Sequence, residues 1–360
     1  MLYSTIYEKV MAGHAAIPYY LGKGKAFAPL RVQIEITGRC NLKCTFCYQG
    51  QAYKAAREEL SLSEIKSIID QIHPFSLLTF SGGEPLLRSD AYEIIEYALA
   101  KGHFCNIITN GVFLTKDIAK LMVEKKLLMI NLSIDGIGET HDAARGVKGT
   151  FEKVITNLCF LNNLKKINKR KFPLIDIKTV IMKENLHQLS DIYKLCKNHN
   201  VYSFTLSLMK NSNLQFNGSL LFKNVEDEVF YKNSFQAEPD FSLESLRKEL
   251  SGLESIKEKV ILRYYPRFNN HRNMMEYLDK NSRNIANYAR PCLEPWSGFQ
   301  INAFGNAYPC LSYSVGSVRE KGLKEIWNSN KFIDFRNKLK RLKVFPACYG
   351  CCYLRSKEGV

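Results

Sequence analysis

Short apolar runs alternate with amphipathic stretches between residues 30 and 208. The runs are rich in β-branched residues, as buried parallel strands are. We expect strands at Leu30–Thr37, Leu77–Ser81, Phe104–Thr109, Leu128–Ile134, Leu174–Met182 and Phe204–Leu208. The stretches between the runs have helical periodicity, and the first begins with a capping box, Ser61-Leu62-Ser63-Glu64. Six strand–helix units in succession predict an α/β fold with a parallel sheet and right-handed crossovers.

The segments outside this repeat have a different character. Residues 1–29 form a mixed lead-in that is too short for an independent binding domain. Residues 209–290 are rich in Asn, Lys and aromatic residues, and we expect a mostly helical bridging segment there. Residues 291–360 include a hairpin-like run, Gly298–Cys310, and then a helix. We therefore divide the chain into a lead-in, a core at residues 30–208, a bridge and a small C-terminal domain.

Composition and charge restrict the partners rather than the fold. The chain of 360 residues is 46% hydrophobic and 24% charged, has no apolar run long enough to span a membrane, and lacks an N-terminal signal core. We therefore expect a cytoplasmic protein, in which the 11 cysteines indicate metal binding rather than disulfides. The net charge of +16 suits nucleic acid or an anionic small molecule. The sequence has no recognised nucleic-acid-binding motif, which favours the small molecule.

Three cysteines follow the first predicted strand directly. Cys40, Cys44 and Cys47 have C-x3-C-x2-C spacing, and a loop of this length can turn three thiolates toward one point. Three thiolates hold three irons of a [4Fe–4S] cube and leave the fourth iron open, whereas the usual set is four cysteines. An open metal position indicates a catalytic site. A zinc knuckle and a chance cluster are the alternatives to this interpretation.

The spacing, with Phe46 just before the last cysteine, resembles the signature of the radical S-adenosylmethionine (SAM) enzymes. The resemblance covers about residues 30–208 and implies a partial (β/α)6 barrel, with fewer units than the eight of a closed barrel. It also implies an external one-electron donor of the flavodoxin or ferredoxin type. Reductive cleavage of SAM would then give a 5′-deoxyadenosyl radical that takes a hydrogen atom from the substrate. Phe46 is a candidate platform for the adenine ring.

Polar motifs at the ends of the following strands extend this resemblance. Gly82, Gly83 and Glu84 look like the GGEP motif, whose glycines allow close backbone approach and whose residues bind the amine of SAM. By the same resemblance, the residues expected to contact SAM after the third and fourth strands are Asn110, Ser133, Asp135 and Arg145. The guanidinium of Arg145 suits a carboxylate. The structural alternative is a plain turn at the glycines, Asn110 and Asp135, and a surface ion pair at Arg145.

Five further cysteines lie in the C-terminal domain. Cys292 and Cys310 flank the hairpin-like run, and Cys348 and Cys351 have C-x2-C spacing, with Cys352 adjacent. Two cysteine pairs brought together make a four-thiolate site, for which structural zinc is one interpretation. The region resembles the shortened SPASM, or twitch, domain, which implies one auxiliary [4Fe–4S] cluster on Cys292, Cys310, Cys348 and Cys351. Cys352 is the alternative to Cys351, because adjacent side chains usually point apart.

Together these resemblances imply a radical SAM enzyme that acts on a sugar, a cyclitol or another small metabolite, with a net oxidation as one outcome. The auxiliary cluster would accept an electron from the product or bind the substrate directly. A ribosomal-peptide maturase of the SPASM type is an alternative, although residues 1–29 are too few for a leader-binding module. A non-catalytic iron–sulfur or zinc protein that binds nucleic acid is the alternative from another class. Such a protein has no need of Glu84 and the GGEP turn, which therefore favour the enzyme.

Overall fold

The computed structural model describes residues 2–47, 58–209, 241–256, 260–279, 289–310, 313–345, 348, 351–355 and 357. Its centre is a ten-stranded sheet in the order β10-β9-β8-β1-β2-β3-β4-β5-β6-β7. The strands are β1 (Arg31–Thr37), β2 (Leu77–Gly82), β3 (Phe104–Thr109), β4 (Met129–Ser133), β5 (Leu174–Val180), β6 (Ser203–Ser207), β7 (Ile261–Tyr265), β8 (Gly298–Ile301), β9 (Asn306–Tyr308) and β10 (Gly316–Ser317). Strands β1 to β8 pair in parallel, and β9 and β10 continue the sheet in antiparallel pairing.

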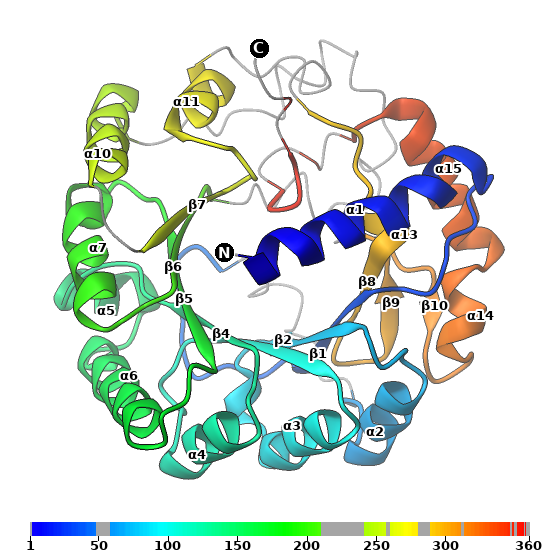
Figure 1. Cartoon of the computed structure of the whole chain (residues 1–360), viewed down its shortest axis with the longest axis horizontal. Coiled ribbons are helices and arrows are strands. Elements are labelled where there is room, and N and C mark those ends of the chain that lie inside the picture. The colour runs from blue at the N-terminus through cyan, green and yellow to red at the C-terminus, as the bar shows by residue number, and fades with distance from the viewer. Residues whose placement is uncertain are drawn as a thin grey trace.

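Most of the helices surround this curved sheet, as Figure 1 shows. The helices are α1 (Leu2–Leu21), α2 (Leu62–Asp70), α3 (Ala91–Ala100), α4 (Lys116–Glu124), α5 (Glu139–Arg145), α6 (Thr150–Ile167), α7 (Leu189–Asn198), α10 (Leu243–Ser255), α11 (His271–Asp279), α13 (Glu294–Ser297), α14 (Leu323–Trp327) and α15 (Asn330–Leu342), with short 3-10 turns η1 (Pro85–Leu87) and η2 (Leu186–Gln188). The capping box predicted for α2 is confirmed. The Glu64 amide donates to the Ser61 hydroxyl at 3.2 Å, and the Ser61 amide donates to the Glu64 carboxylate at 2.7 Å.

The six predicted strands all form and pair in the predicted parallel order, so the partial barrel is confirmed. Two parallel strands were not predicted as part of it. Strand β7 lies within the bridging segment, much of which (210–240, 257–259 and 280–288) is outside the described residues. Strand β8 belongs to the predicted hairpin, but it also pairs in parallel with β1. Strands β7 and β8 are at opposite ends of the parallel order and do not pair in the described part of the chain, so the barrel stays open between them.

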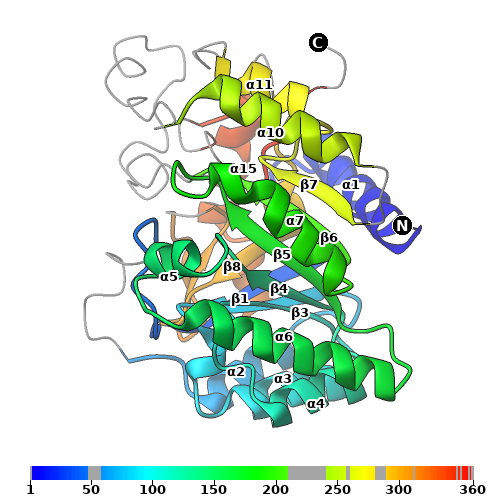
Figure 2. The same ribbon diagram turned by 90° about the vertical axis from the view of Figure 1, so that its left-hand side faces the viewer.

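The C-terminal segment lies beside the opening of the barrel, and the N-terminal helix α1 lies at one end of the strands. The Arg267 amide, just after β7, donates to the Leu354 carbonyl at 2.7 Å, so the C-terminal segment runs beside the β7 edge. The Tyr353 ring lies over the Arg31 guanidinium of β1, 4.4 Å from its Cζ atom. Helix α1 lies at the end of the strands opposite to α5 (Figure 2). The prediction of a mixed lead-in missed this helix, because apolar residues such as Ile17 lie on its exposed face and obscure the periodicity.

The inner face of the barrel is polar, whereas its outer face forms the core with the helices. Along β5, Ile175 and Ile177 are fully buried against the helical layer, and Asp176 and Lys178 alternate with them and face inward. Polar side chains inside a barrel that stays partly open suit a polar ligand. Within the described residues, no helix has the length and apolar character needed to cross a membrane.

Candidate active site

The GGEP segment is joined to the loop that carries the first three cysteines through backbone contacts. The Gly83 amide donates to the Thr37 carbonyl at 2.9 Å, and the Glu84 amide donates to the Arg39 carbonyl at 2.8 Å. Gly82 has a φ of +147°, and a Cβ atom there would lie 2.2 Å from the Thr37 carbonyl oxygen. The close backbone approach predicted for these glycines is therefore made here to the cysteine loop itself.

Glu84 is almost completely buried, with 1% of its surface exposed. Its carboxylate accepts hydrogen bonds from the Thr109 hydroxyl at 2.7 Å, the Asn110 amide at 2.7 Å and the Leu86 amide at 3.0 Å. Burial raises the pKa of the Glu84 carboxyl, and these three donors oppose that shift. Since a carboxylate offers about four acceptor positions, one position remains from which it could bind an ammonium group.

Asn110 connects the same region to the cysteine loop by a second route. Its side-chain amide donates to the Asn41 side-chain oxygen at 3.0 Å, and its own oxygen accepts from the Val112 amide at 3.0 Å. Thr109 and Asn41 are functional-site residues that the sequence interpretation missed. Thr109 could have been found from its position beside Asn110 at the end of β3. No local pattern in the sequence indicates Asn41.

Asp135 and Arg145 form a buried ion pair beside the cysteine loop. Their side chains are 0% and 10% exposed, so the predicted alternative of a surface ion pair at Arg145 is wrong. The Arg145 Nη1 atom donates to the Sγ atom of Cys44 at 3.5 Å, and its Cζ atom lies 5.3 Å from the centre of the Phe46 ring. Among the described residues, the buried Nε atom of Arg145 has no hydrogen-bond partner. This donor could bind an anionic group of a ligand in the site.

Helix α5 carries Arg145 and fixes the cysteine loop with its last turn. The Lys43 amide donates to the Arg145 carbonyl at 3.0 Å, and the Thr45 amide donates to the Ala144 carbonyl at 3.2 Å. The helix ends at Gly146, whose φ of +70° is the left-handed conformation that glycine favours. A Cβ atom there would lie 2.5 Å from the Lys43 carbonyl oxygen, so this contact also requires a glycine.

Cys40, Cys44 and Cys47 lie together at the carboxyl end of β1, and all three are free thiols. Burial raises the pKa of the Cys40 and Cys44 thiols, and the Arg145 charge opposes this at Cys44. Within the described ranges, no three His, Cys, Asp or Glu side chains converge closely enough to hold a single metal ion. Thiolates on a four-iron cube bind different irons and need not converge on one atom, so this set of donors fits a cluster.

Ser133 lies apart from these contacts. It is the last residue of β4, is half-buried, and pairs in register with Lys178 of β5 on the inner face of the barrel. The structure therefore brings two groups of predicted residues to the cysteine loop: Glu84 with Asn110, and Asp135 with Arg145. It places Ser133 apart from them, on the inner face of the barrel.

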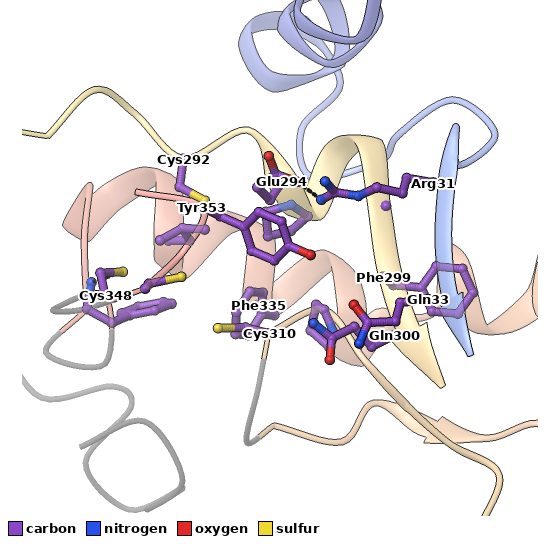
Figure 3. A pocket seen from close by; sticks show the side chains of 16 residues that line it. Arg31, Gln33, Cys292, Glu294, Phe299, Gln300, Cys310, Phe335, Cys348 and Tyr353 are labelled. Carbon is purple, nitrogen blue, oxygen red and sulfur yellow. Dashed lines mark hydrogen bonds and ion pairs between the residues drawn. The ribbon is translucent and has the colours of Figure 1, made fainter. Parts of the chain in front are cut away.

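The predicted auxiliary site is a hollow between the C-terminal domain and β1 (Figure 3). It encloses about 620 Å³ of empty space, part of which is open to solvent. The lining residues include Cys292, Cys310, Cys348, Cys351, Phe335, Phe345 and Tyr353. Cys352 is not among the described residues that line the hollow. Burial raises the pKa of the Cys348 thiol to about 12, and four thiols in a largely apolar hollow suit soft metal ligation.

Two family profiles match the regions that contain these two sites. Residues 34–196 match the radical SAM superfamily, and residues 292–352 match the SPASM iron–sulfur cluster-binding domain. The chain belongs to the radical SAM superfamily. It is an enzyme whose cofactors are SAM, a SAM-binding [4Fe–4S] cluster and an auxiliary iron–sulfur cluster in the SPASM domain. The zinc and non-catalytic alternatives are therefore wrong.

Several curated relatives align with most of this radical SAM chain. The Fe-coproporphyrin III synthase of Methanosarcina barkeri is 29% identical over 81% of this chain and 72% of the relative. The AdoMet-dependent heme synthase of Oleidesulfovibrio alaskensis is 29% identical over 96% of this chain and 88% of the relative. A mycofactocin maturase of Mycolicibacterium smegmatis is 32% identical, but only over 47% of this chain and 42% of the relative.

Solved structures share the fold of this radical SAM enzyme. The crystal structure of Streptococcus suis SuiB bound to S-adenosylmethionine superposes with a TM-score of 0.66 at 16% sequence identity. The match covers 90% of this chain and 71% of SuiB. At this level of identity, the similarity supports the architecture alone.

Proposed function

We propose that this radical SAM enzyme acts on a carboxylate-bearing tetrapyrrole and takes a hydrogen atom from it. The observation that carries the proposal is the extent of the alignments. Relatives named for heme or coproporphyrin synthesis align over 81% and 96% of the chain. The relative named as a mycofactocin maturase aligns over only 47% of it. A tetrapyrrole is one of the small anionic molecules that the net charge of +16 favours.

In this proposal the barrel residues bind and orient SAM and its cluster. Cys40, Cys44 and Cys47 hold the [4Fe–4S] cluster, whose reducing electron cleaves SAM when both are bound. Glu84 accepts from the SAM amine with its remaining acceptor position. The other residues assigned to SAM binding or to shaping its site are Phe46, Gly82, Gly83, Asn110, Ser133, Asp135 and Arg145. Cys292, Cys310, Cys348 and Cys351, which line the C-terminal hollow, would hold the auxiliary cluster.

The same proposal includes the domain limits and the partners. Residues 30–208 form the radical SAM core, 1–29 the lead-in, 209–290 the bridge and 291–360 the SPASM-type domain. The enzyme takes its electron from a flavodoxin- or ferredoxin-type donor, and we propose a cytoplasmic location where such donors occur. Modification of a ribosomal peptide is the second candidate function, and the match to the mycofactocin maturase over 47% of the chain favours it.

The substrate class can be tested with anaerobically reconstituted enzyme, SAM, dithionite and Fe-coproporphyrin III. We expect 5′-deoxyadenosine to form faster when the tetrapyrrole is present, with a matching change in the tetrapyrrole mass. The Cys40→Ala/Cys44→Ala/Cys47→Ala variant is the control and should produce none. If 5′-deoxyadenosine forms no faster with Fe-coproporphyrin III and the tetrapyrrole stays unchanged, the proposed substrate class is wrong.

A further inference from the structure

A partly buried cation, Lys178, faces the interior of the barrel from β5. The Nζ atom of Lys178 lies 3.4 Å from the Oδ2 atom of Asp176 and 4.5 Å from the centre of the Tyr265 ring. Only 22% of the Lys178 side chain is exposed. Lysine is rarely buried unless it is paired, and a paired lysine inside a ligand-binding barrel requires an explanation beyond packing.

Asp176 is fixed in place by its neighbours and so fixes Lys178. Its Oδ1 atom accepts hydrogen bonds from the Ser203 hydroxyl at 2.5 Å and the Thr205 hydroxyl at 2.8 Å. The Oδ2 atom is then left for the ammonium of Lys178. An ammonium has three N–H donors, and Asp176 is its only ion-pair partner in the described part of the chain. Lys178 therefore keeps donors for a further acceptor.

Lys178 lies between the two proposed cluster sites. Two residues farther along β5, the Val180 amide donates to the Asp135 carboxylate at 2.7 Å, and Asp135 pairs with Arg145 at the cysteine loop. On the other side, Cys352 of the C-terminal segment is near enough to influence the Lys178 ammonium. A substrate that contacts Lys178 would thus lie inside the barrel between the SAM site and the auxiliary site.

A second cation lies on the same face of the sheet, two strands from Lys178: Lys178 pairs in register with Thr205 of β6, and Thr205 pairs with Arg263 of β7. Tyr264 of β7 faces outward, because its hydroxyl donates to Glu254 of α10, so the adjacent Arg263 faces inward by strand alternation. Arg263 has no ion-pair partner in the described ranges. Burial lowers the pKa of Lys178, but its neighbours Tyr265 and Asp176 outweigh this and hold that pKa above the ordinary value. The ammonium therefore stays charged near neutral pH.

We propose that Lys178, with Arg263 two strands away on the same face, binds a carboxylate of the substrate and so fixes the substrate between the two cluster sites. The inference rests on the proposed function, because it requires a substrate that carries carboxylates. Asp176 and Tyr265 orient the ammonium, and the free N–H donors of Lys178 make charge-assisted hydrogen bonds to the carboxylate oxygens.

The test measures binding of two probes, coproporphyrin III and its methyl ester, to the reconstituted holoenzyme by absorbance titration. The ester retains the tetrapyrrole but lacks the carboxylates. Lys178→Met should weaken binding of the acid about 10- to 100-fold and leave binding of the ester unchanged, while Lys178→Arg should retain most of the acid affinity. Lys101→Met is the matched control. Lys101 also pairs with an aspartate, Asp70, and lies 5.1 Å from a tyrosine ring, but it is on the outer surface.

The two proposals fail in different ways in this experiment. If the wild-type enzyme binds the acid and Lys178→Met binds it equally well, the role of Lys178 is wrong and the substrate class stands. If Lys178→Met loses affinity for acid and ester alike, the lysine acts on barrel structure, and the inference is again overturned. If the wild-type enzyme binds neither probe, the tetrapyrrole proposal is overturned and the inference falls with it.

Discussion

The Nη1 atom of Arg145 lies 3.5 Å from the Sγ atom of Cys44, although 101 residues of sequence separate the two. The contact joins the last turn of α5 to the loop that carries Cys40, Cys44 and Cys47. The same arginine pairs with Asp135, which accepts from the Val180 amide of β5. The cysteine loop is therefore held from the side by a buried ion pair as well as from β1, on which it begins.

Replacement of Arg145 by Met should destabilise the enzyme and disturb its SAM cluster. The change leaves the buried Asp135 carboxylate without its cationic partner, which costs about 3–5 kcal/mol in such pairs. Chemical denaturation of the cluster-free protein measures the loss, and the electron paramagnetic resonance spectrum of the reduced holoenzyme reports on the cluster. The double variant Asp135→Asn/Arg145→Met should recover part of the stability. A stability equal to wild type for Arg145→Met would contradict the assignment.

Replacement of Cys40, Cys44 and Cys47 together by Ala should abolish SAM cleavage and leave the barrel folded. None of the three side chains belongs to the buried apolar core, so the circular dichroism spectrum should be unchanged. The reconstituted wild-type enzyme should contain about eight irons and the triple variant about four, since each site holds a four-iron cluster. Remaining production of 5′-deoxyadenosine by the triple variant would show that other residues hold the SAM cluster.

Local pattern was enough to predict the strands from β1 to β6 and the motifs at their ends. Each predicted strand has buried residues on its helix-facing side, such as Ile34 in β1 and Ile177 in β5, and this repetition is visible in the sequence. The cysteine spacing and the GGEP segment are likewise contiguous in sequence. Their joint placement follows from parallel pairing, because the carboxyl ends of neighbouring parallel strands meet at one edge.

Features that depend on distant contacts could not be predicted in this way. Helix α5 is only seven residues long and lies between glycines, so its sequence reads as a turn. Strand β7 carries Arg263 and Tyr265 on its inner face, so its sequence lacks the continuous apolar run by which the other parallel strands were predicted. Asp176, the partner of Lys178, is held by two hydroxyl groups of β6, and no periodicity in β5 alone indicates them.

Replacement of Glu84 by Gln should weaken SAM binding about 10- to 100-fold, because a charge-assisted contact to an ammonium is worth about 1.5–3 kcal/mol. The structure adds a second expectation. The new NH2 group would replace an oxygen that accepts from the Asn110 amide, the Thr109 hydroxyl or the Leu86 amide. Two donors would then face each other, so the free energy of unfolding should also fall. Thr109→Val is the control, since it removes one of these contacts and keeps the charge. Calorimetry measures SAM affinity, and an affinity equal to wild type would exclude a role for the Glu84 charge.

His141 should make the free energy of unfolding depend on pH below neutrality. Its ring is buried, its Nδ1 atom accepts from the Asp135 amide at 3.1 Å, and burial followed by the Arg145 charge lowers its pKa to about 3. The unfolded chain binds a proton near the ordinary pKa of 6.5, and the folded chain does not until about pH 3. The stability from neutral His141 is therefore complete above pH 6.5. It should be lost on acidification at up to about 1.4 kcal/mol per pH unit.

The comparison of wild type with His141→Gln isolates this contribution from the other titrating groups. Urea unfolding between pH 4 and pH 7 should show a smaller pH slope for the variant, with the largest difference at the acid end. The side-chain oxygen of Gln can accept a hydrogen bond from the Asp135 backbone amide, and Gln does not titrate, so it is a suitable replacement. Equal slopes for both proteins would mean that His141 has the same pKa in the folded and unfolded chains, and would contradict the lowered pKa.

Cys351 and Cys352 are adjacent, and the structure distinguishes between them. Cys351 lines the C-terminal hollow with Cys292, Cys310 and Cys348, and its amide donates to the Cys348 carbonyl at 3.1 Å, which closes a tight turn. In the background of the Cys40→Ala/Cys44→Ala/Cys47→Ala variant, Cys351→Ala should remove most of the remaining iron. Cys352→Ala should retain about four irons in that background. Iron analysis with the visible absorption spectrum measures both. Loss of the cluster in Cys352→Ala with retention in Cys351→Ala would reverse the assignment.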